Sequence, residues 1–317
     1  MPWHLGIDEN GLGPQLGPMI VTGVMARLTE ASERRLASEA SSFLHERLAD
    51  SKLLVDHHHV SLGEAWARAL QAGARGQVNP PATPDEMVHG LSLLDRQALR
   101  APCPSTAVAQ CWSTGDEAFE ATEDELEAAR SDLASLRVAG MDVVWAKSVI
   151  VCVKRINEHR AVGRSRLDVD LRSMEELIVA ARSEAGEGIH AVCGKVGGMQ
   201  RYAERFTALS GRLLTVLEEA RAQSSYRIAS VGTVRFLRDA ESRDPLVALA
   251  SLVGKAVREV LMRRVVGYYR RQDGTLRDAS GYNDPVTDAF VRATRPLRER
   301  GSIPDGCFLR EQGRRSR

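Results

Sequence analysis

The chain has 317 residues, of which 43% are hydrophobic and 27% charged, a composition typical of a globular protein with a sizeable core. No apolar stretch approaches the roughly 20 residues that span a bilayer, and the N-terminus lacks the basic start and cleavage pattern of a signal peptide. We therefore expect a cytoplasmic protein with no membrane partner. The five cysteines lack metal-site spacing and indicate free thiols: Cys103, Cys111, Cys152, Cys193 and Cys307.

Charge is unevenly distributed along the sequence. The formal net charge is +1, yet residues 254–317 contain 15 Lys and Arg against 8 Asp and Glu. A basic C-terminal quarter beside an acidic remainder suits a protein that holds a polyanion near carboxylates. A solvated, arginine-rich helix face would give the same pattern.

The N-terminal part begins with two strand patterns. The apolar and β-branched stretches WHLGID and PMIVTGVMARL predict a hairpin around a Gly- and Pro-rich segment. Helical spacing predicts helices over 31–48 and 60–73. Together these patterns indicate an α/β arrangement from the start of the chain.

Residues 74–130 differ in character from the rest. They are acidic and rich in loop-forming residues, with one helix expected over 85–99. We interpret this segment as an insertion.

The C-terminal half alternates strands and helices again, which argues for a sheet with helices on both faces. The predicted elements are a strand over 135–146, helices over 148–160 and 170–184, a strand over 188–194, a helix over 199–222 and a strand over 232–238. The longest predicted helix covers 245–271 and begins with a well-placed Pro245. Its last turns carry basic residues that favour a helix C-terminus and could also face phosphate: Arg263, Arg264, Arg270 and Arg271.

Adjacent carboxylates, Asp8 and Glu9, end the first predicted strand and precede a glycine-rich stretch. Two neighbouring carboxylates repel each other, so a buried or half-buried pair needs a cation between them or solvent around them. The pattern is therefore either a solvated turn or half of a metal site.

Five segments resemble, in the same order, the conserved segments of type 2 ribonucleases H (the ribonuclease HII family and its archaeal and eukaryotic relatives). They are GIDENGLGPQLGPMIVTG, ADSKLL, CGKVGGMQRY, ALASLVGKAVRE and ASGYNDPVTDAFV. The first is similar to the family pattern G-[IV]-D-E-A-G-R-G-P-x-x-G-P. The resemblance implies a ribonuclease H-like fold, a mixed sheet flanked by helices, with a catalytic domain over 1–262 and a basic helical extension over 263–317.

The resemblance also implies a function and a set of ligands. Family members are endonucleases that cut the RNA strand of RNA/DNA hybrids, or a ribonucleotide within a DNA duplex, with two Mg²⁺ or Mn²⁺ ions held by four carboxylates, since hard cations prefer carboxylate oxygen. Asp8 and Glu9 match the first two acids. The fourth matches Glu241, with Asp239 as a nearby substitute.

The third acid of the family falls on Cys193. A thiol is a poor ligand for Mg²⁺, so the resemblance implies that Cys193→Asp would restore cleavage. The arginine of the family's G-R-G loop falls on Leu12, which removes a cation from a loop that contacts the ribose 2′-hydroxyls.

Substrate contacts are implied at three places. The matching residues are Gly11, Leu12 and Gly13; Asp50, Ser51 and Lys52; and Lys255, Arg258 and Tyr282. Ordinary surface residues would be the alternative for the basic positions. We expect a monomer.

Other features have simpler interpretations. The run His57–His59 could bind a metal, although consecutive side chains point in different directions, and Cys103 and Cys111 have no metal-site spacing. His190 and Asp142 are expected in the sheet. Asp168 and Asp170 could lend a replacement carboxylate, but helix capping is the commoner role there.

Two functions remain open from the sequence. One is a divergent metal-dependent ribonuclease, with Asp8 and Glu241 as principal ligands. The other is an inactive descendant that binds nucleic acid or a protein partner. The substitutions at positions 12 and 193 favour the second, and the other matching residues favour the first.

Overall fold

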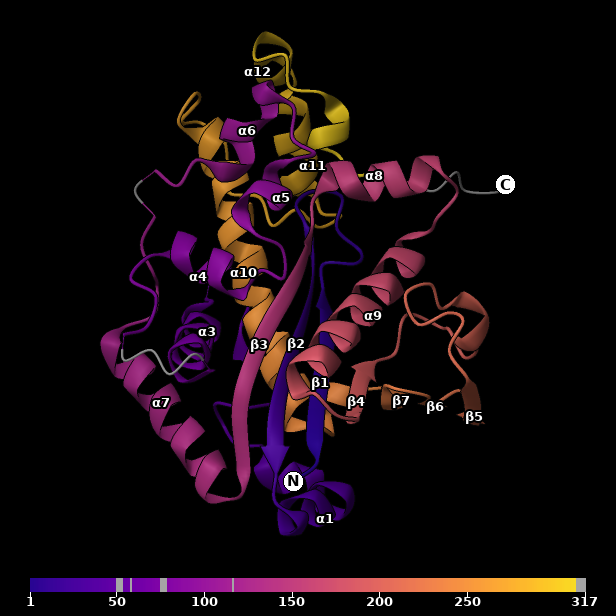
Figure 1. Cartoon of the computed structure of the whole chain (residues 1–317). Helices are drawn as coiled ribbons and strands as arrows, with labels where there is room; N and C mark the ends of the chain where they lie inside the picture. Colours follow the sequence, from indigo (N-terminus) through magenta and orange to yellow (C-terminus); the bar gives the residue numbers. More distant parts are fainter. Residues whose placement is uncertain (50–53, 58, 75–78, 116, 312–317) are drawn as a thin grey trace.

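The computed structural model describes residues 1–49, 54–57, 59–74, 79–115 and 117–311 (Figure 1). Within them, one mixed sheet has the strand order β3-β2-β1-β4-β7-β6-β5. The strands are β1 (Trp3–Asn10), β2 (Met19–Leu28), β3 (Met141–Val151), β4 (Ile189–Gly194), β5 (Leu214–Glu219), β6 (Gln223–Ile228) and β7 (Gly232–Leu237). β1, β4 and β7 are parallel to one another, and the other neighbours pair antiparallel.

The helices cover both faces of this sheet (Figure 1). They are α1 (Glu30–Glu39), α3 (Ser61–Ala74), α4 (Pro84–Leu91), α5 (Arg96–Arg100), α6 (Ser105–Trp112), α7 (Glu123–Val138), α8 (Val153–Ala161), α9 (Arg166–Ala185), α10 (Pro245–Arg270), α11 (Pro285–Ala293) and α12 (Arg295–Arg300). Short 3₁₀ turns are η1 (Ala40–Phe43), η2 (Ala203–Arg205), η3 (Ala240–Ser242) and η4 (Asp305–Cys307). The expected mixed sheet flanked by helices is confirmed. Among the described helices, none has the length and apolar character of a membrane span.

Alternation along the central strands sends neighbouring side chains to different layers. On β2, Ile20 and Val24 join a core with α3, α4, α7 and α10. Met19 and Val21 join a second core with α9. The same alternation on β1 decides on which side each candidate carboxylate lies.

Helix α10 lies directly against β1. Its N-cap is Asp244, whose carboxylate accepts hydrogen bonds from the amides of Leu246 (2.9 Å) and Val247 (3.2 Å). The approach is close enough that a Cβ on Gly6 would collide with the backbone of Leu246 and Val247. Glycine at position 6 therefore sets the distance between the strand and the helix.

Several predicted boundaries are wrong. The helix expected over 31–48 ends at Glu39, where a serine-rich stretch with low helix propensity follows. Residues 135–138 end α7, and the strand begins at Met141 after Gly140, which has φ +87°. Ser148 and the β-branched residues 149–151 pair with β2, so the helix predicted from 148 begins only at Val153.

The helix expected over 199–222 is wrong in type. That stretch contains η2 and the edge strand β5, which forms a hairpin with β6. A strand with mostly exposed side chains lacks the buried alternation by which a strand is recognised. The segment 74–130 has more helix than expected, because α4, α5, α6 and the start of α7 lie in it, and α4 ends at Leu91.

Beyond residue 262, α10 continues without a break to Arg270 and is followed by α11 and α12. These helices pack with α10 around Tyr269, Phe290 and Phe308. The division into domains at residue 262 stays a prediction.

Candidate active site at the ends of the parallel strands

A pocket of about 540 Å³ lies at the carboxyl ends of β1, β4 and β7. Three of the four residues expected to be catalytic line it: Asp8, Glu9 and Glu241. Its other lining residues include Asn10, Gly11, Lys195, Arg221, Arg238, Asp239, Ser251, Lys255 and Tyr282. The pocket therefore combines carboxylates, cations, glycine backbone and one aromatic ring.

Asp8 is the most perturbed acid of the pocket. Its side chain points from β1 towards α10, and burial raises its pKa to about 8, with a further contribution from the charge of Glu241 and a smaller one from Glu9. A hydrogen bond with Ser251 of α10 opposes this rise. Two carboxylates from distant parts of the chain thus repel each other in one pocket.

Glu241 belongs to η3, in the short connection between β7 and α10. The preceding Asp239 has a left-handed backbone, with φ 53° and ψ 43°, a conformation that aspartate tolerates better than most residues. Asp239 also lines the pocket, so the connection presents two carboxylates.

Glu9 is oriented differently from Asp8. Its Oε1 accepts a hydrogen bond of 2.9 Å from the amide of Leu12. By alternation along β1 it shares the face of Ile7, opposite to that of Asp8. Glu9 therefore orders the start of the glycine-rich loop while it lines the pocket.

Cys193 does not line the pocket. It pairs with Ile7 in the β1–β4 register and is completely buried in the core beneath α9, where burial raises the pKa of its thiol. Its neighbour Gly194 faces Asp8 instead, because a Cβ there would lie 3.0 Å from Asp8 Oδ1. The structure thus brings Asp8, Glu9 and Glu241 together and leaves Cys193 on the other side of the strand.

Asp170 is a buried acid behind the pocket. It is 1% exposed, and neither carboxylate oxygen has a hydrogen-bond partner. Burial, followed by the charges of Glu9 and Asp8, raises its pKa well above the ordinary value. Ser165 is the N-cap of α9 and forms a capping box with Asp168. Capping therefore explains Asp168 but not Asp170.

The donor chemistry of the pocket fits one hard divalent cation. Carboxylate oxygens of Asp8 and Glu241 are suitable ligands, and a cation would relieve their repulsion. Across the described ranges, however, no group of three or more His, Cys, Asp or Glu side chains is placed to hold a metal ion.

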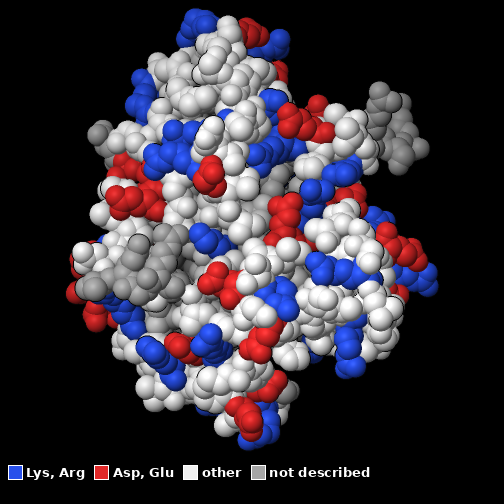
Figure 2. Space-filling model, in the orientation of Figure 1, with Lys and Arg blue, Asp and Glu red and all other residues white. Residues whose placement is uncertain are grey.

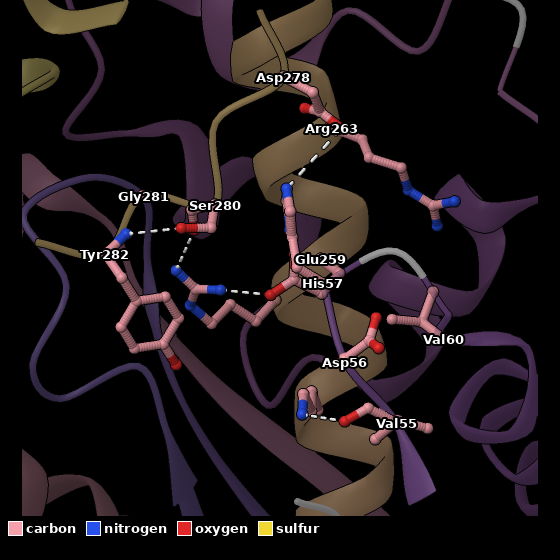
Figure 3. A network of polar contacts seen from close by, with 12 residues as sticks. Val55, Asp56, His57, Val60, Glu259, Arg263, Asp278, Ser280, Gly281 and Tyr282 are labelled. Carbon is pink, nitrogen blue, oxygen red and sulfur yellow. Dashed lines mark hydrogen bonds and ion pairs between the residues drawn. The ribbon is translucent and has the colours of Figure 1, made fainter. Parts of the chain in front are cut away.

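Tyr282 stands at the rim of the pocket and is 46% exposed (Figure 3). The guanidinium of Arg258 lies 4.7 Å from the centre of its ring. Arg258 itself is only 1% exposed, pairs with Glu259 and donates to Ser280 O (3.0 Å). Arg258 therefore supports the tyrosine from below and does not line the pocket, whereas Lys255 does and also donates to Val55 O.

His57 joins this network from the segment that precedes α3. Its Nδ1 lies 2.6 Å from Glu259 Oε2 and its Nε2 lies 3.7 Å from Asp278 Oδ2, as Figure 3 shows. The two carboxylates, Asp278 first, raise the pKa of His57 to about 9. This role could not be predicted from the sequence, because the partners of His57 are more than 200 positions away.

The glycine-rich loop closes the other side of the pocket. Gly11 has φ +88° and packs on Arg258, Leu12 is half-buried against the core beneath α9, and Gly13 is exposed. The remaining expected contacts, Asp50, Ser51 and Lys52, lie outside the described residues.

The pocket also contains two cations that were not predicted from the sequence, Arg221 and Arg238, which follow β5 and β7. The expectation that Arg263 and Arg264 of α10 could face phosphate is wrong. Arg263 pairs with Glu64 and Glu120, and Arg264 pairs with Asp85 and Glu117, so neither faces phosphate. His190 and Asp142 lie in strands, as expected.

No protein-family model and no curated protein matches this chain. Solved structures similar to it include ribonuclease HII from Archaeoglobus fulgidus, in a complex with PCNA (17% identity, TM-score 0.45), which covers 99% of this chain and 96% of that one. Ribonuclease H2 from Pyrococcus horikoshii OT3 is 16% identical, with a TM-score of 0.44 and coverage of 96% and 92%. Bst-RNase HIII in complex with Mn²⁺ is 14% identical, with a TM-score of 0.44 and coverage of 97% and 66%. These similarities are of fold.

Proposed function

We propose that the protein is a divalent-cation-dependent nuclease that hydrolyses the RNA strand of an RNA/DNA hybrid or cuts at a ribonucleotide in a DNA duplex. The observation that carries the proposal is that Asp8 and Glu241, from distant parts of the chain, line one pocket at the ends of three parallel strands, where each disfavours the charge of the other. Mutual repulsion of this kind costs stability unless a cation binds between the two groups.

Each side of the pocket has a separate task in this proposal. A Mg²⁺ or Mn²⁺ ion held by Asp8 and Glu241 would supply Lewis-acid stabilisation of the phosphate undergoing hydrolysis. Lys255, Arg221 and Arg238 attract the sugar–phosphate backbone. The exposed ring of Tyr282 offers a surface on which a sugar or base can pack. For a second ion, which the family resemblance implies, Glu9 would be the further carboxylate of the pocket, beside the hydrogen bond that its Oε1 accepts from the amide of Leu12.

The test is cleavage of a DNA duplex that contains one ribonucleotide, in Mn²⁺ and in Mg²⁺. We expect strand scission at the ribonucleotide by the wild type and none by Asp8→Asn or Glu241→Gln, both of which should still fold. Asp142→Asn, a change at a partly exposed strand residue outside the pocket, is the matched control and should keep full activity.

Nucleic-acid binding without cleavage is the second candidate. It is favoured by the burial of Cys193 outside the pocket and by the hydrogen bond that Glu9 accepts from the glycine-rich loop. Binding of the hybrid by the wild type without scission in either metal would establish this alternative. If no duplex binds at all, both functions fail.

A further inference from the structure

Arg310 lies beneath the glycine-rich loop and contacts its backbone. The side chain is 1% exposed although it carries a guanidinium. Nε donates to Gly17 O (2.8 Å), and Nη1 donates to Gly11 O (2.6 Å) and more weakly to Leu12 O (3.4 Å). A single side chain thus holds both ends of the loop.

The chain brings Arg310 to this place through a short backbone pairing. Leu309 forms an antiparallel bridge with Leu16, and the amide of Arg310 donates to Gln15 O (2.9 Å). On the outer side, Asn157 of α8 donates to Leu309 O (2.9 Å) and accepts from the amide of Glu311 (2.9 Å). The position of Arg310 is therefore fixed by backbone on one side and by a buried amide on the other.

Two further side chains complete a cradle for the loop carbonyls. Arg166, at the start of α9, donates to Pro14 O (3.2 Å) and lies 3.4 Å from Leu12 O and Gly13 O. Asn283 donates to Gly13 O (3.2 Å). Every carbonyl from Gly11 to Pro14 thus accepts a hydrogen bond from a side chain.

This cradle decides where the loop amides point. A trans peptide holds its C=O and N–H on opposite sides, so inward carbonyls turn the following amides outward. The amide of Leu12 is used by Glu9. The amide of Gly13 has no partner among the described residues, and a Cβ on this exposed glycine would meet nothing within 4 Å.

Burying the charged guanidinium of Arg310 costs free energy, because part of its hydration is not replaced by hydrogen bonds. Nη2 of Arg310 has no hydrogen-bond partner, and burial, with the charges of Arg258 and Arg166, lowers its pKa to about 9. A hydrophobic residue would fill the space at lower cost. Arginine here is instead suited to its acceptors, since its planar fork can bond several carbonyls at once.

We propose that Arg310 is a positioning residue that fixes the loop Gly11–Pro14 so that the Gly13 amide is presented to the RNA strand. This loop has Leu12 at the position where the family pattern has an arginine. An outward amide can donate to a ribose 2′-hydroxyl, which DNA lacks. Arg310 therefore sets the preference for RNA/DNA hybrid over DNA duplex. The inference rests on the proposed nucleic-acid function.

The experiment compares affinities for a fluorescent RNA/DNA hybrid and for a DNA duplex of the same sequence, by anisotropy, in the full chain carrying Asp8→Asn to prevent cleavage. We expect Arg310→Met to reduce the hybrid-to-DNA preference about fivefold, the effect of roughly one hydrogen bond. Arg310→Lys should keep part of the preference. Arg298→Met, which removes another buried arginine of the C-terminal segment with no contact to the loop, is the matched control and should leave it unchanged.

A second pair of variants tests the amide without touching Arg310. Gly13→Pro removes the N–H and should abolish the preference, whereas Gly13→Ala keeps the N–H in open space and should retain it. These variants keep the inference falsifiable even if Arg310→Met fails to fold.

The outcomes distinguish a failure of this inference from a failure of the proposed function. A wild-type preference that survives Arg310→Met or Gly13→Pro overturns the inference and leaves the proposed function standing. A wild type that binds neither duplex overturns the proposed function, and the inference falls with it.

Discussion

His57 pairs with Glu259 of α10 and with Asp278, so its protonation should affect the free energy of unfolding. Its pKa is raised from 6.5 to about 9 by Asp278 and Glu259, so protonated His57 stabilises the folded chain below pH 6.5. That stabilisation is lost as the pH rises through about 9. We expect the free energy of unfolding in urea to fall by about 1 to 2 kcal/mol between these pH values because of this group, which is less than the full pKa shift would give, since solvent screens the partly exposed pairs.

His57→Gln should flatten that dependence. The control is His59→Gln, at an exposed side chain that pairs only with Asp56 among the described residues, and it should leave the pH profile as in the wild type. Equal slopes for wild type and His57→Gln would show that the two carboxylates do not hold the proton.

Cys193→Asp separates the sequence-based expectation from the structural one. The family resemblance predicts that it restores Mg²⁺-dependent cleavage. The structure predicts instead a loss of about 3 kcal/mol or more in unfolding free energy, because a carboxylate would be buried on the α9 face beside Asp170. Cys193→Ser is the control, with a small loss. Stronger cleavage without loss of stability would contradict the placement of Cys193.

At the residue scale, the acids Asp8, Glu9 and Glu241 could be predicted to share a site because their types and order resemble a known pattern. The orientation of Cys193 and the burial of Arg258 could not. Which face of β4 a residue occupies depends on the β1–β4 register, and the burial of Arg258 depends on Tyr282 and Glu259. Both are set by tertiary packing, which no local pattern records.

At the scale of elements, the contact between β1 and α10 is the one that places Asp8 beside Ser251. Gly6→Ala should destabilise the protein by about 3 kcal/mol or more, since the new Cβ meets backbone that cannot turn aside. The measurement is urea unfolding, together with the cleavage assay proposed above.

Gly73→Ala is the matched control, because this glycine lies in helix α3 with open space around its Cα. It should stabilise the protein by up to about 1 kcal/mol. A harmless Gly6→Ala would mean that the helix can move away from the strand.

Long elements with strong periodicity were predictable, and short edge elements were not. The 26-residue helix α10 has a clear 3.6-residue period and a proline at its start, and it was predicted almost to the residue. The hairpin of β5 and β6 was missed because β5 is mostly exposed. That error hid Arg221, so part of the pocket's positive charge was missed with it.

At the scale of the molecule, the described part of the basic C-terminal quarter does not present a continuous basic surface on the face shown in Figure 2. Figure 2 shows Lys and Arg interspersed with Asp and Glu on the face in view. Arg258, Arg264, Arg298 and Arg310 are buried, and Arg263 and Arg295 pair with acids. If the protein binds a polyanion, the loss of affinity with rising salt should therefore come mainly from the pocket.

Replacing both Arg221 and Arg238 by glutamine should lower the slope of log affinity against log salt by about 1.8, the release of two counterions. The control changes Arg270 and Arg271 to glutamine. These exposed arginines end α10, and Arg270 lies about 22 Å along the helix from Lys255. A slope that responds to the control pair instead would place the polyanion on the C-terminal quarter.

The pairing of Leu309 and Arg310 with the loop after β1 has a consequence for synthesis. The loop is synthesised before the segment that holds it, and the carbonyl of Gly11 can meet Arg310 only after 299 further residues have been added. Contacts between such distant parts of a chain form late, because the intervening chain must be ordered first. A nascent chain can thus assemble the β1–β2 hairpin while the Gly13 amide is still unfixed. The proposed preference for RNA/DNA hybrid would then arise only after residue 310 has been synthesised and packed.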